Sequence, residues 1–172
     1  MELMDVYDEE RQRTGRTMER SQQPAPGDHR TVVHLCVFNA AGELLIQRRS
    51  AAKYTYPLRW DVTAAGAVDA GETSRQAAER ELREELGYAL DLTGVRPVMT
   101  VNFPGGFDDF FVVEREIPLE TLTLQREEVC DAAWVRLAEA ERMVRAKEFC
   151  PYPLGLLTVL YSLRHGNGFV DE

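Results

Sequence analysis

Three glutamates, Glu81, Glu84 and Glu85, directly follow an arginine, Arg80, in the chain. Residues three or four positions apart lie one turn apart on a helix, where like charges repel by roughly a few tenths of a kcal/mol per pair. Stability gives no reason for such a cluster, although a solvated helix face is the simple alternative in an acidic protein. A hard cation such as Mg²⁺ or Mn²⁺ prefers carboxylate oxygens and removes the repulsion. The spacing therefore predicts a site for a divalent cation and a phosphate ester.

The helix that would carry these glutamates has clear signals at both ends. Thr73, with Gln76 three residues later, matches a capping box, and Gly87 stands where a left-handed C-terminal cap is expected. The apolar stripe of this helix consists of Ala78, Leu82 and Leu86. The spacing predicts that Arg80 and the three glutamates lie off the core-facing stripe and point toward a groove.

The remaining elements follow from periodicity and turn residues. We expect an N-terminal hairpin from residues 4–10 and 16–20 with its turn at Thr14 and Gly15, then a linker over residues 22–28. Further strands are predicted over residues 31–39, 44–48, 60–63, 95–103, 110–116 and 129–137, and further helices over 138–148 and 154–165. The irregular alternation predicts an α/β fold with a mixed sheet covered on both faces. We expect residues 1–28 to belong to the same domain as residues 29–172.

Composition limits the classes of function. The chain has 172 residues, 44% of them hydrophobic, and a formal net charge of −9, which fits one globular domain and disfavours binding to nucleic acid or anionic membranes. The acidic N-terminus does not resemble a signal peptide, and we expect no membrane span. Cys36, Cys130 and Cys150 are widely spaced without a metal-ligand pattern, so we expect buried free thiols and a cytoplasmic location.

The segment that carries the glutamates resembles the Nudix box. It reads Gly66, five residues, Glu72, seven residues, Arg80-Glu81, an aliphatic residue, one residue, Glu84-Glu85, one residue, Gly87 and a hydrophobic residue. All seven fixed positions are present, and only Tyr88 differs, as it stands where an aliphatic residue is usual.

The resemblance implies an α/β/α sandwich that hydrolyses a diphosphate linkage with Mg²⁺, or alternatively Mn²⁺. The substrate class implied is a nucleoside diphosphate derivative or a similar small molecule. By resemblance, Glu81, Glu84, Glu85 and the backbone carbonyl of Ala65 are metal ligands. Arg80 is expected to orient a catalytic carboxylate, and Glu72 to be its partner across the loop.

The general base and the phosphate-binding residues remain open at this point. A base could come from Glu81 or Glu85 inside the box, or from Glu127 or Glu128 in a later loop, where surface glutamates are otherwise usually solvated. Among these loop residues we select Glu128 as the catalytic candidate and Glu127 as a substrate contact. Arg48 and Arg49 could hold a phosphate, or simply end an exposed strand.

Other residues have weaker claims to the site. Lys53 and Arg59 are further basic candidates, and His34 is expected to be structural because it lies in an apolar strand. Four aromatic residues could stack on a substrate but are more typical of a core, namely Trp60, Phe103, Phe107 and Trp134. Substrate choice is expected to depend on the loops at residues 50–59, 104–109 and 125–131.

Residues 29–66 are also similar to isopentenyl-diphosphate isomerases, which supply the main rival function. These isomerases carry a catalytic cysteine and a metal-binding histidine where this chain has Ala64 and Ala67. The complete box and the two alanines favour a hydrolase on an isomerase-like scaffold. A Nudix-fold domain that binds nucleotides without cleaving them is a second rival, although such domains usually lose box carboxylates. The resemblance is compatible with a monomer or a homodimer.

Overall fold

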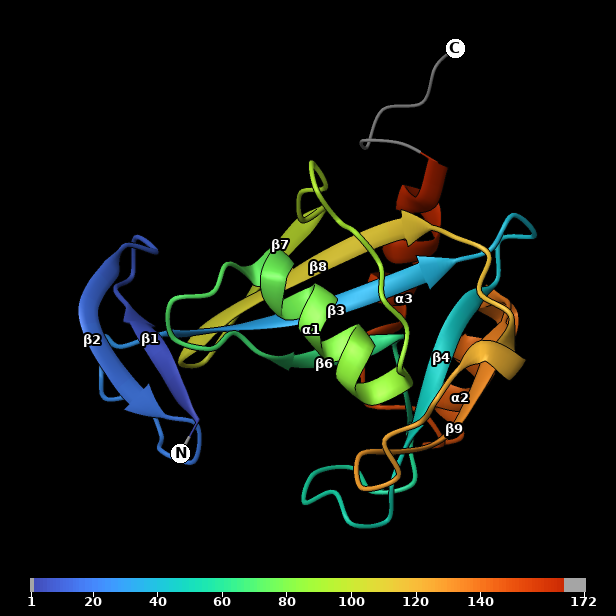
Figure 1. Ribbon diagram of the computed structural model, residues 1–172, viewed down its shortest axis with the longest axis horizontal. Coiled ribbons are helices and arrows are strands. Elements are labelled where there is room, and N and C mark those ends of the chain that lie inside the picture. The colour runs from blue at the N-terminus through green and yellow to red at the C-terminus, as the bar shows by residue number, and fades with distance from the viewer. Residues whose placement is uncertain (1, 166–172) are drawn as a thin grey trace.

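The computed structural model describes residues 2–165, which fold around one twisted sheet with helices on both faces (Figure 1). The strands are β1 (Leu3–Tyr7), β2 (Arg13–Glu19), β3 (Arg30–Phe38), β4 (Leu44–Arg49), β5 (Trp60–Asp61), β6 (Ala64–Ala67), β7 (Met99–Phe103), β8 (Gly106–Glu114) and β9 (Val129–Val135). The helices are α1 (Ser74–Leu86), α2 (Leu137–Arg145) and α3 (Leu154–Ser162), with short 3₁₀ helices η1 (Leu119–Thr121) and η2 (Leu163–His165). Within residues 2–165, no helix has both the length and the apolar character needed to cross a membrane.

The main sheet is mixed, as the sequence predicted. Strand β3 pairs in parallel with β8 and antiparallel with β4 and β6, while β7 extends the sheet beyond β8. On the other side, β4 pairs with β5 and β9, both antiparallel. Strand β3 is therefore central, and its pairing with β6 places the start of the Nudix-like segment in the middle of the fold.

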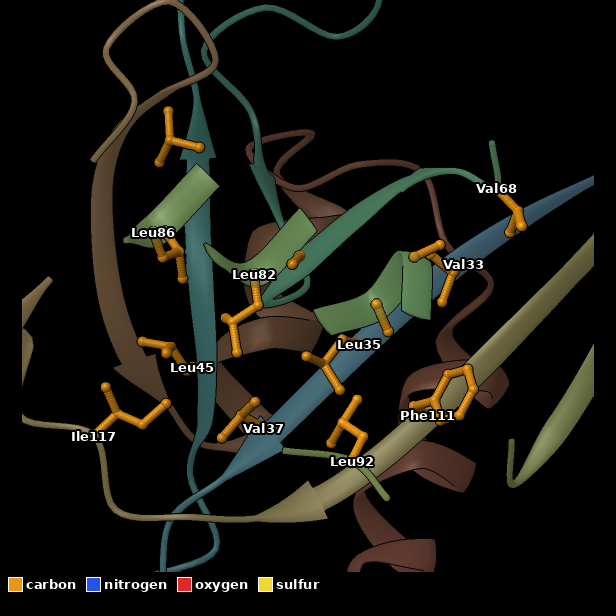
Figure 2. Close-up of a cluster of buried hydrophobic side chains, with 14 residues drawn as sticks. Val33, Leu35, Val37, Leu45, Val68, Leu82, Leu86, Leu92, Phe111 and Ile117 are labelled. Atoms are coloured by element: carbon orange, nitrogen blue, oxygen red, sulfur yellow. The ribbon is translucent and has the colours of Figure 1, made fainter. Parts of the chain in front are cut away.

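Side chains on β3 alternate between two cores because successive residues of a strand point to opposite faces. Val33, Leu35 and Val37 face α1 and pack with Leu82 and Leu86, as Figure 2 shows. On the opposite face, Cys36 and Phe38 belong to a second core covered by α2 and α3. The prediction of a sheet covered on both faces is confirmed. Cys36 and Cys150 are buried free thiols, and Cys130 is partly buried.

The N-terminal hairpin forms a separate two-stranded sheet, but its turn was misplaced by the sequence analysis. Thr14 and Gly15 lie inside β2, and the chain reverses at residues 8–12. Asp8 explains this position, because its Oδ1 accepts hydrogen bonds from the backbone N–H groups of Glu10 (3.0 Å) and Gln12 (2.8 Å).

Two other expectations need correction. The strand predicted from residue 95 begins only at Met99, because Pro97 lacks the N–H group that strand pairing requires. Strand β6 was not predicted separately, because its sequence, AAGA, has no β-branched or aromatic residue. It exists because Val33, His34 and Leu35 of β3 pair with it.

Candidate active site

Helix α1 is fixed at both ends by the residues that the sequence singled out. The Thr73 side chain and the Gln76 side chain form a reciprocal capping box with the backbone. Gly87 ends the helix with φ of 68°, and a side chain there would come within 2.7 Å of the Thr123 side chain. A glycine is thus required at position 87 both by conformation and by space.

Glu81 is buried against Gly66, which explains the glycine at the start of the box. A Cβ atom on Gly66 would lie 1.9 Å from Glu81 Oε1, so only glycine leaves room for this carboxylate. The Glu81 side chain is 9% exposed and is held by Arg80 at 2.8 Å. Burial raises the pKa of Glu81, and the hydrogen bond from Arg80 partly opposes that rise.

Glu85 lies one turn further along the same face and is 4% exposed. Its Oε2 accepts hydrogen bonds from Gln47 Nε2 (3.0 Å) and from the backbone N–H of Ala65 (3.3 Å). Burial raises the pKa of Glu85 to about 8, and the nearby charge of Glu81 contributes to the rise. Gln47 Oε1, beside it, is buried without a hydrogen-bond partner. A cation at this position would remove the repulsion between the two carboxylates.

Arg80 connects the helix to the loop before it. Its guanidinium makes a two-pronged contact with Glu72 (3.0 Å for both bonds) and also donates to the Ala67 carbonyl (2.9 Å) and to Glu84 (3.2 Å). Burial alone would raise the pKa of Glu72, but the hydrogen bonds from Arg80 outweigh it and lower that pKa. Arg80 therefore connects Glu72 of the loop to Glu81 of the helix.

The three glutamates do not all point off the core, which corrects the sequence analysis. Glu81 and Glu85 are buried, and only Glu84, with a side chain 49% exposed, faces outward. No three acidic, histidine or cysteine side chains within residues 2–165 lie in metal-ligand geometry, and Arg80 binds both Glu81 and Glu84. The residues nevertheless fit a hard cation, because two buried carboxylates lie in adjacent turns beside the glycine that leaves room for one of them.

A cavity of about 1290 Å³ opens beside this cluster. Its wall includes Ala65, Gly66 and Ala67 of β6, and two of these residues are in contact with the buried glutamates, Gly66 with Glu81 and Ala65 with Glu85. The hairpin end of residues 2–23, the loop at residues 52–56 and the loop at residues 127–128 also contribute to the wall. The remaining wall residues lie on β3, at Arg49 and Asp61, and at residues 150–152. The cavity thus has the position and size for a small-molecule substrate.

Glu127 and Glu128 both line this cavity, at the point where their loop meets the loop after β4. Ser50 holds the two loops together, since its hydroxyl donates to the Glu127 carbonyl (2.5 Å) and its N–H to the Glu128 carbonyl (2.8 Å). The Glu128 carboxylate forms an ion pair with Lys53, another residue of the cavity wall. Glu128 therefore lies on the same cavity as the box, with a cation beside it.

The two arginines at the end of β4 point in different directions, as successive residues of a strand do. Arg49 lines the cavity, and its guanidinium reaches Asp61 Oδ2 (3.4 Å) and the Thr55 carbonyl (3.0 Å). Arg48 instead donates to the Leu58 carbonyl (3.0 Å) and is not among the described residues that line the cavity.

The aromatic residues at the cavity are not those that the sequence suggested. Trp60, Phe107 and Trp134 belong to the cores or pack against them, and Phe103 lies over Gly106. The aromatic side chains that line the cavity, among residues 2–165, are Tyr54, Tyr56, Tyr152 and His34. His34 stacks on Phe110 with ring centroids 4.5 Å apart, and burial lowers its pKa.

A buried polar group around Asp61 was missed by the sequence analysis. Asp61 accepts hydrogen bonds from the Tyr152 hydroxyl (2.7 Å) and the Cys150 thiol (3.3 Å), and all three residues line the cavity. Burial, followed by the charge of Asp61, raises the pKa of both Tyr152 and Cys150. About 90 residues separate the acid from its partners, so no local pattern could have revealed the contact.

Comparison with known proteins gives a consistent result. The model of the NUDIX domain matches residues 27–153. An uncharacterized Nudix hydrolase of Listeria monocytogenes is 44% identical over 96% of both chains, and an isopentenyl-diphosphate Δ-isomerase of Streptomyces griseus is 30% identical over 94% of this chain and 83% of its own. A crystal structure from Deinococcus radiodurans aligns over 93% of this chain and 99% of its own, with a TM-score of 0.74 and 25% identity.

Proposed function

Because this chain belongs to the Nudix hydrolase family, we propose that it cleaves a diphosphate linkage in a small phosphorylated molecule. The observation that carries this proposal is the pair of buried glutamates, Glu81 and Glu85, which contact Gly66 and Ala65 in the wall of the cavity. A nucleoside diphosphate derivative is the substrate class that we propose. Its diphosphate would lie near β6, and the rest of the molecule would fill the cavity.

Mg²⁺ is the cation that we propose, with Mn²⁺ as an alternative. Glu81, Glu84, Glu85 and the Ala65 carbonyl would hold it, and when bound it would neutralise phosphoryl charge and make a water molecule nucleophilic. Arg80 would keep the carboxylate of Glu81 oriented through their hydrogen bond, and Glu72 would keep Arg80 in place. Gly66 and Gly87 serve the structure of the motif.

We propose that Glu128 accepts the proton of the attacking water, because it lines the same cavity as Gly66, the first residue of the box. Arg49 and Lys53 would neutralise the substrate phosphates from the cavity wall. Glu127 lies in the same wall and would contact the substrate through its exposed side chain. Arg48 has no part in this proposal because its guanidinium is bound to the backbone of Leu58.

Isomerisation of isopentenyl diphosphate is the second candidate function, because a related isomerase aligns with most of the chain. Its catalytic thiol and metal-binding histidine are replaced by Ala64 and Ala67. Cys150 does bring a thiol to the cavity, but that thiol donates to Asp61 and burial raises its pKa, so it is held in the protonated form. We therefore rank hydrolysis above isomerisation. The three free cysteines support a location in a reducing cytoplasm. We propose that the protein acts there as a monomer or a homodimer.

The test is a metal-dependent screen of nucleoside di- and triphosphates, ADP-ribose, dinucleotides and isoprenoid diphosphates. We expect Mg²⁺-dependent release of phosphate or of a nucleotide from at least one compound, and loss of that activity in Glu84→Gln and Glu85→Gln. Full activity in both variants would refute the metal role. Isomerisation of isopentenyl diphosphate without any hydrolysis would establish the second candidate instead.

A further inference from the structure

The N-terminal hairpin holds three consecutive residues of the loop between β6 and α1. The Leu3 carbonyl accepts a hydrogen bond from the N–H of Ala70 (2.8 Å), and the Asp5 carboxylate accepts one from the N–H of Gly71 (2.9 Å). The Arg13 guanidinium donates to the carbonyl of Glu72 (2.5 Å). Figure 1 shows this loop reaching from β6 toward β1 before it turns into α1.

The side chains that make this contact are themselves fixed. Asp5 on β1 and Arg13 on β2 form an ion pair (3.3 Å), and the Asp5 side chain is only 18% exposed. On the other side of the hairpin, Met4, Val6 and Met18 are buried together with Ala67, the last residue of β6. The hairpin thus packs on the loop where it leaves the sheet and binds its backbone just before the helix.

This loop carries Glu72, whose position matters to the active site. Glu72 binds Arg80 through both carboxylate oxygens, and Arg80 in turn binds Glu81. Fixing a loop of irregular structure costs conformational entropy, and the contacts that hold the loop must offset that cost. Some of these contacts come from residues 3–13, which lie before the segment that matches the family model. Others come from the loop itself, where the N–H of Glu72 donates to the Asp69 carbonyl (3.0 Å).

We propose that the N-terminal hairpin is a positioning element of the active site, in which Asp5 and Arg13 fix the backbone of residues 70–72 and thereby hold Glu72, Arg80 and Glu81 in the orientation that binds the cation. Neither Asp5 nor Arg13 touches the reacting atoms. Their effect passes through the loop and the Glu72–Arg80 pair. The part of this inference that concerns cation binding rests on the proposed metal-dependent function, whereas the part that concerns the loop does not.

The test compares Asp5→Ala and Arg13→Met with Arg16→Met. Arg16 is the matched control because it lies on the same strand and its ion pair, with Asp28 at 2.6 Å, makes no contact with the loop. Two readouts are used on the full chain: hydrogen exchange of the amides of residues 70–72, and Mn²⁺ affinity measured by the loss of its free paramagnetic resonance signal. Unfolding temperatures are recorded alongside.

We expect roughly tenfold faster exchange at Ala70 and Gly71, and roughly fivefold weaker Mn²⁺ binding, in both hairpin variants but not in Arg16→Met. Arg13→Lys keeps a donor and a charge and should recover most of the affinity. Asp5→Asn keeps an acceptor and provides a milder change should the alanine variant not fold.

Unchanged exchange at residues 70–72 would overturn the proposal, and so would faster exchange with unchanged Mn²⁺ affinity. An equal weakening of Mn²⁺ binding in Arg16→Met would also overturn it, since the effect would then be general. Wild-type protein that binds no Mn²⁺ would refute the proposed metal site, and the exchange measurement would then decide by itself whether the hairpin holds the loop.

Discussion

Glu81 is a buried carboxylate whose position depends on two neighbouring residues, Arg80 and Gly66. In its buried position, Glu81 contacts Arg80. It can occupy that position only because residue 66 is a glycine and has no side chain there. Gly66 has no unusual φ angle, so the requirement is one of space and not of backbone conformation. The first fixed position of the box is therefore explained by a contact between two residues that are fifteen positions apart.

We predict that Gly66→Ala abolishes most of the activity. The new methyl group would overlap the Glu81 carboxylate, 1.9 Å away, and would push it out of its position beside Arg80. We expect kcat to fall about 100-fold, comparable to the loss of a residue that orients a metal ligand. Steady-state kinetics with Mg²⁺ titration would measure this. Gly155→Ala is the control, because nothing lies within 4 Å of its new Cβ atom, and activity equal to that of Gly155→Ala would contradict the prediction.

The Glu72–Arg80 pair predicts a pH dependence of stability. Arg80 lowers the pKa of Glu72 below its ordinary value of 4.5, so the folded form binds this proton less tightly than the unfolded form. The stabilisation is therefore complete above about pH 4.5 and is lost as the pH falls through the lowered pKa. We expect Glu72→Gln to lower the free energy of unfolding by about 2 kcal/mol at pH 7, and by less at pH 3.

Urea unfolding between pH 3 and pH 7 would measure this difference. Glu139→Gln serves as the control, because Glu139 pairs with Arg142 on the surface, where such pairs contribute little. If the difference in the free energy of unfolding between wild type and Glu72→Gln is the same at every pH from 3 to 7, the charge of Glu72 is not the cause of the destabilisation.

At the scale of elements, a second contact anchors the hairpin at its opposite end. Arg11, in the turn between β1 and β2, forms an ion pair with Asp109 of β8, whose side chain is fully buried. Thr100 of β7 completes the group, since its hydroxyl donates to Asp109 Oδ1 at 2.6 Å. The hairpin is thus attached to β8 at its turn and to the loop before α1 along its strands.

We predict that Arg11→Ala destabilises the protein by about 3 kcal/mol, because Asp109 would remain buried without a charged partner. Chemical denaturation would measure the change. The double variant Arg11→Ala/Asp109→Asn removes both charges and should recover part of the loss. If the double variant is as unstable as the sum of the single variants, the buried charge is not the reason.

These contacts also show which elements could be predicted from the sequence. Helix α1 was predictable because its caps, Thr73 and Gly87, and its apolar stripe are local signals. Strand β6 and the Asp61 group were not, because the first depends on pairing with β3 and the second on contacts across about 90 residues. The burial of Glu81 and Glu85 was also missed, since an amphipathic pattern places charged residues outside.

At the scale of the whole molecule, the proposed site is built from parts that are distant in sequence. The hairpin, β6, the loop at residues 52–56 and the loop at residues 127–128 all contribute to one cavity. A chain with a net charge of −9 collects Arg20, Arg30, Arg49 and Lys53 in that cavity wall. Five carboxylates line the same wall, those of Glu2, Glu19, Asp61, Glu127 and Glu128, and three of the cations are paired with them. The wall therefore carries both signs of charge, and a phosphorylated ligand would have to compete with carboxylates for these cations.

A cation held by the three box glutamates and the Ala65 carbonyl should stabilise the whole fold, because it would bind the folded form and not the unfolded chain. At a concentration 100 times its dissociation constant, it would add about 2.7 kcal/mol to the free energy of unfolding. We therefore predict that Mn²⁺ raises the thermal unfolding temperature measured by calorimetry, and that a chelator reverses the shift. In Glu85→Gln the shift should largely disappear, although this variant should itself be no less stable without metal, because burial and Glu81 already disfavour the charged form of Glu85. An equal Mn²⁺ shift in Glu85→Gln would place the cation elsewhere on the protein.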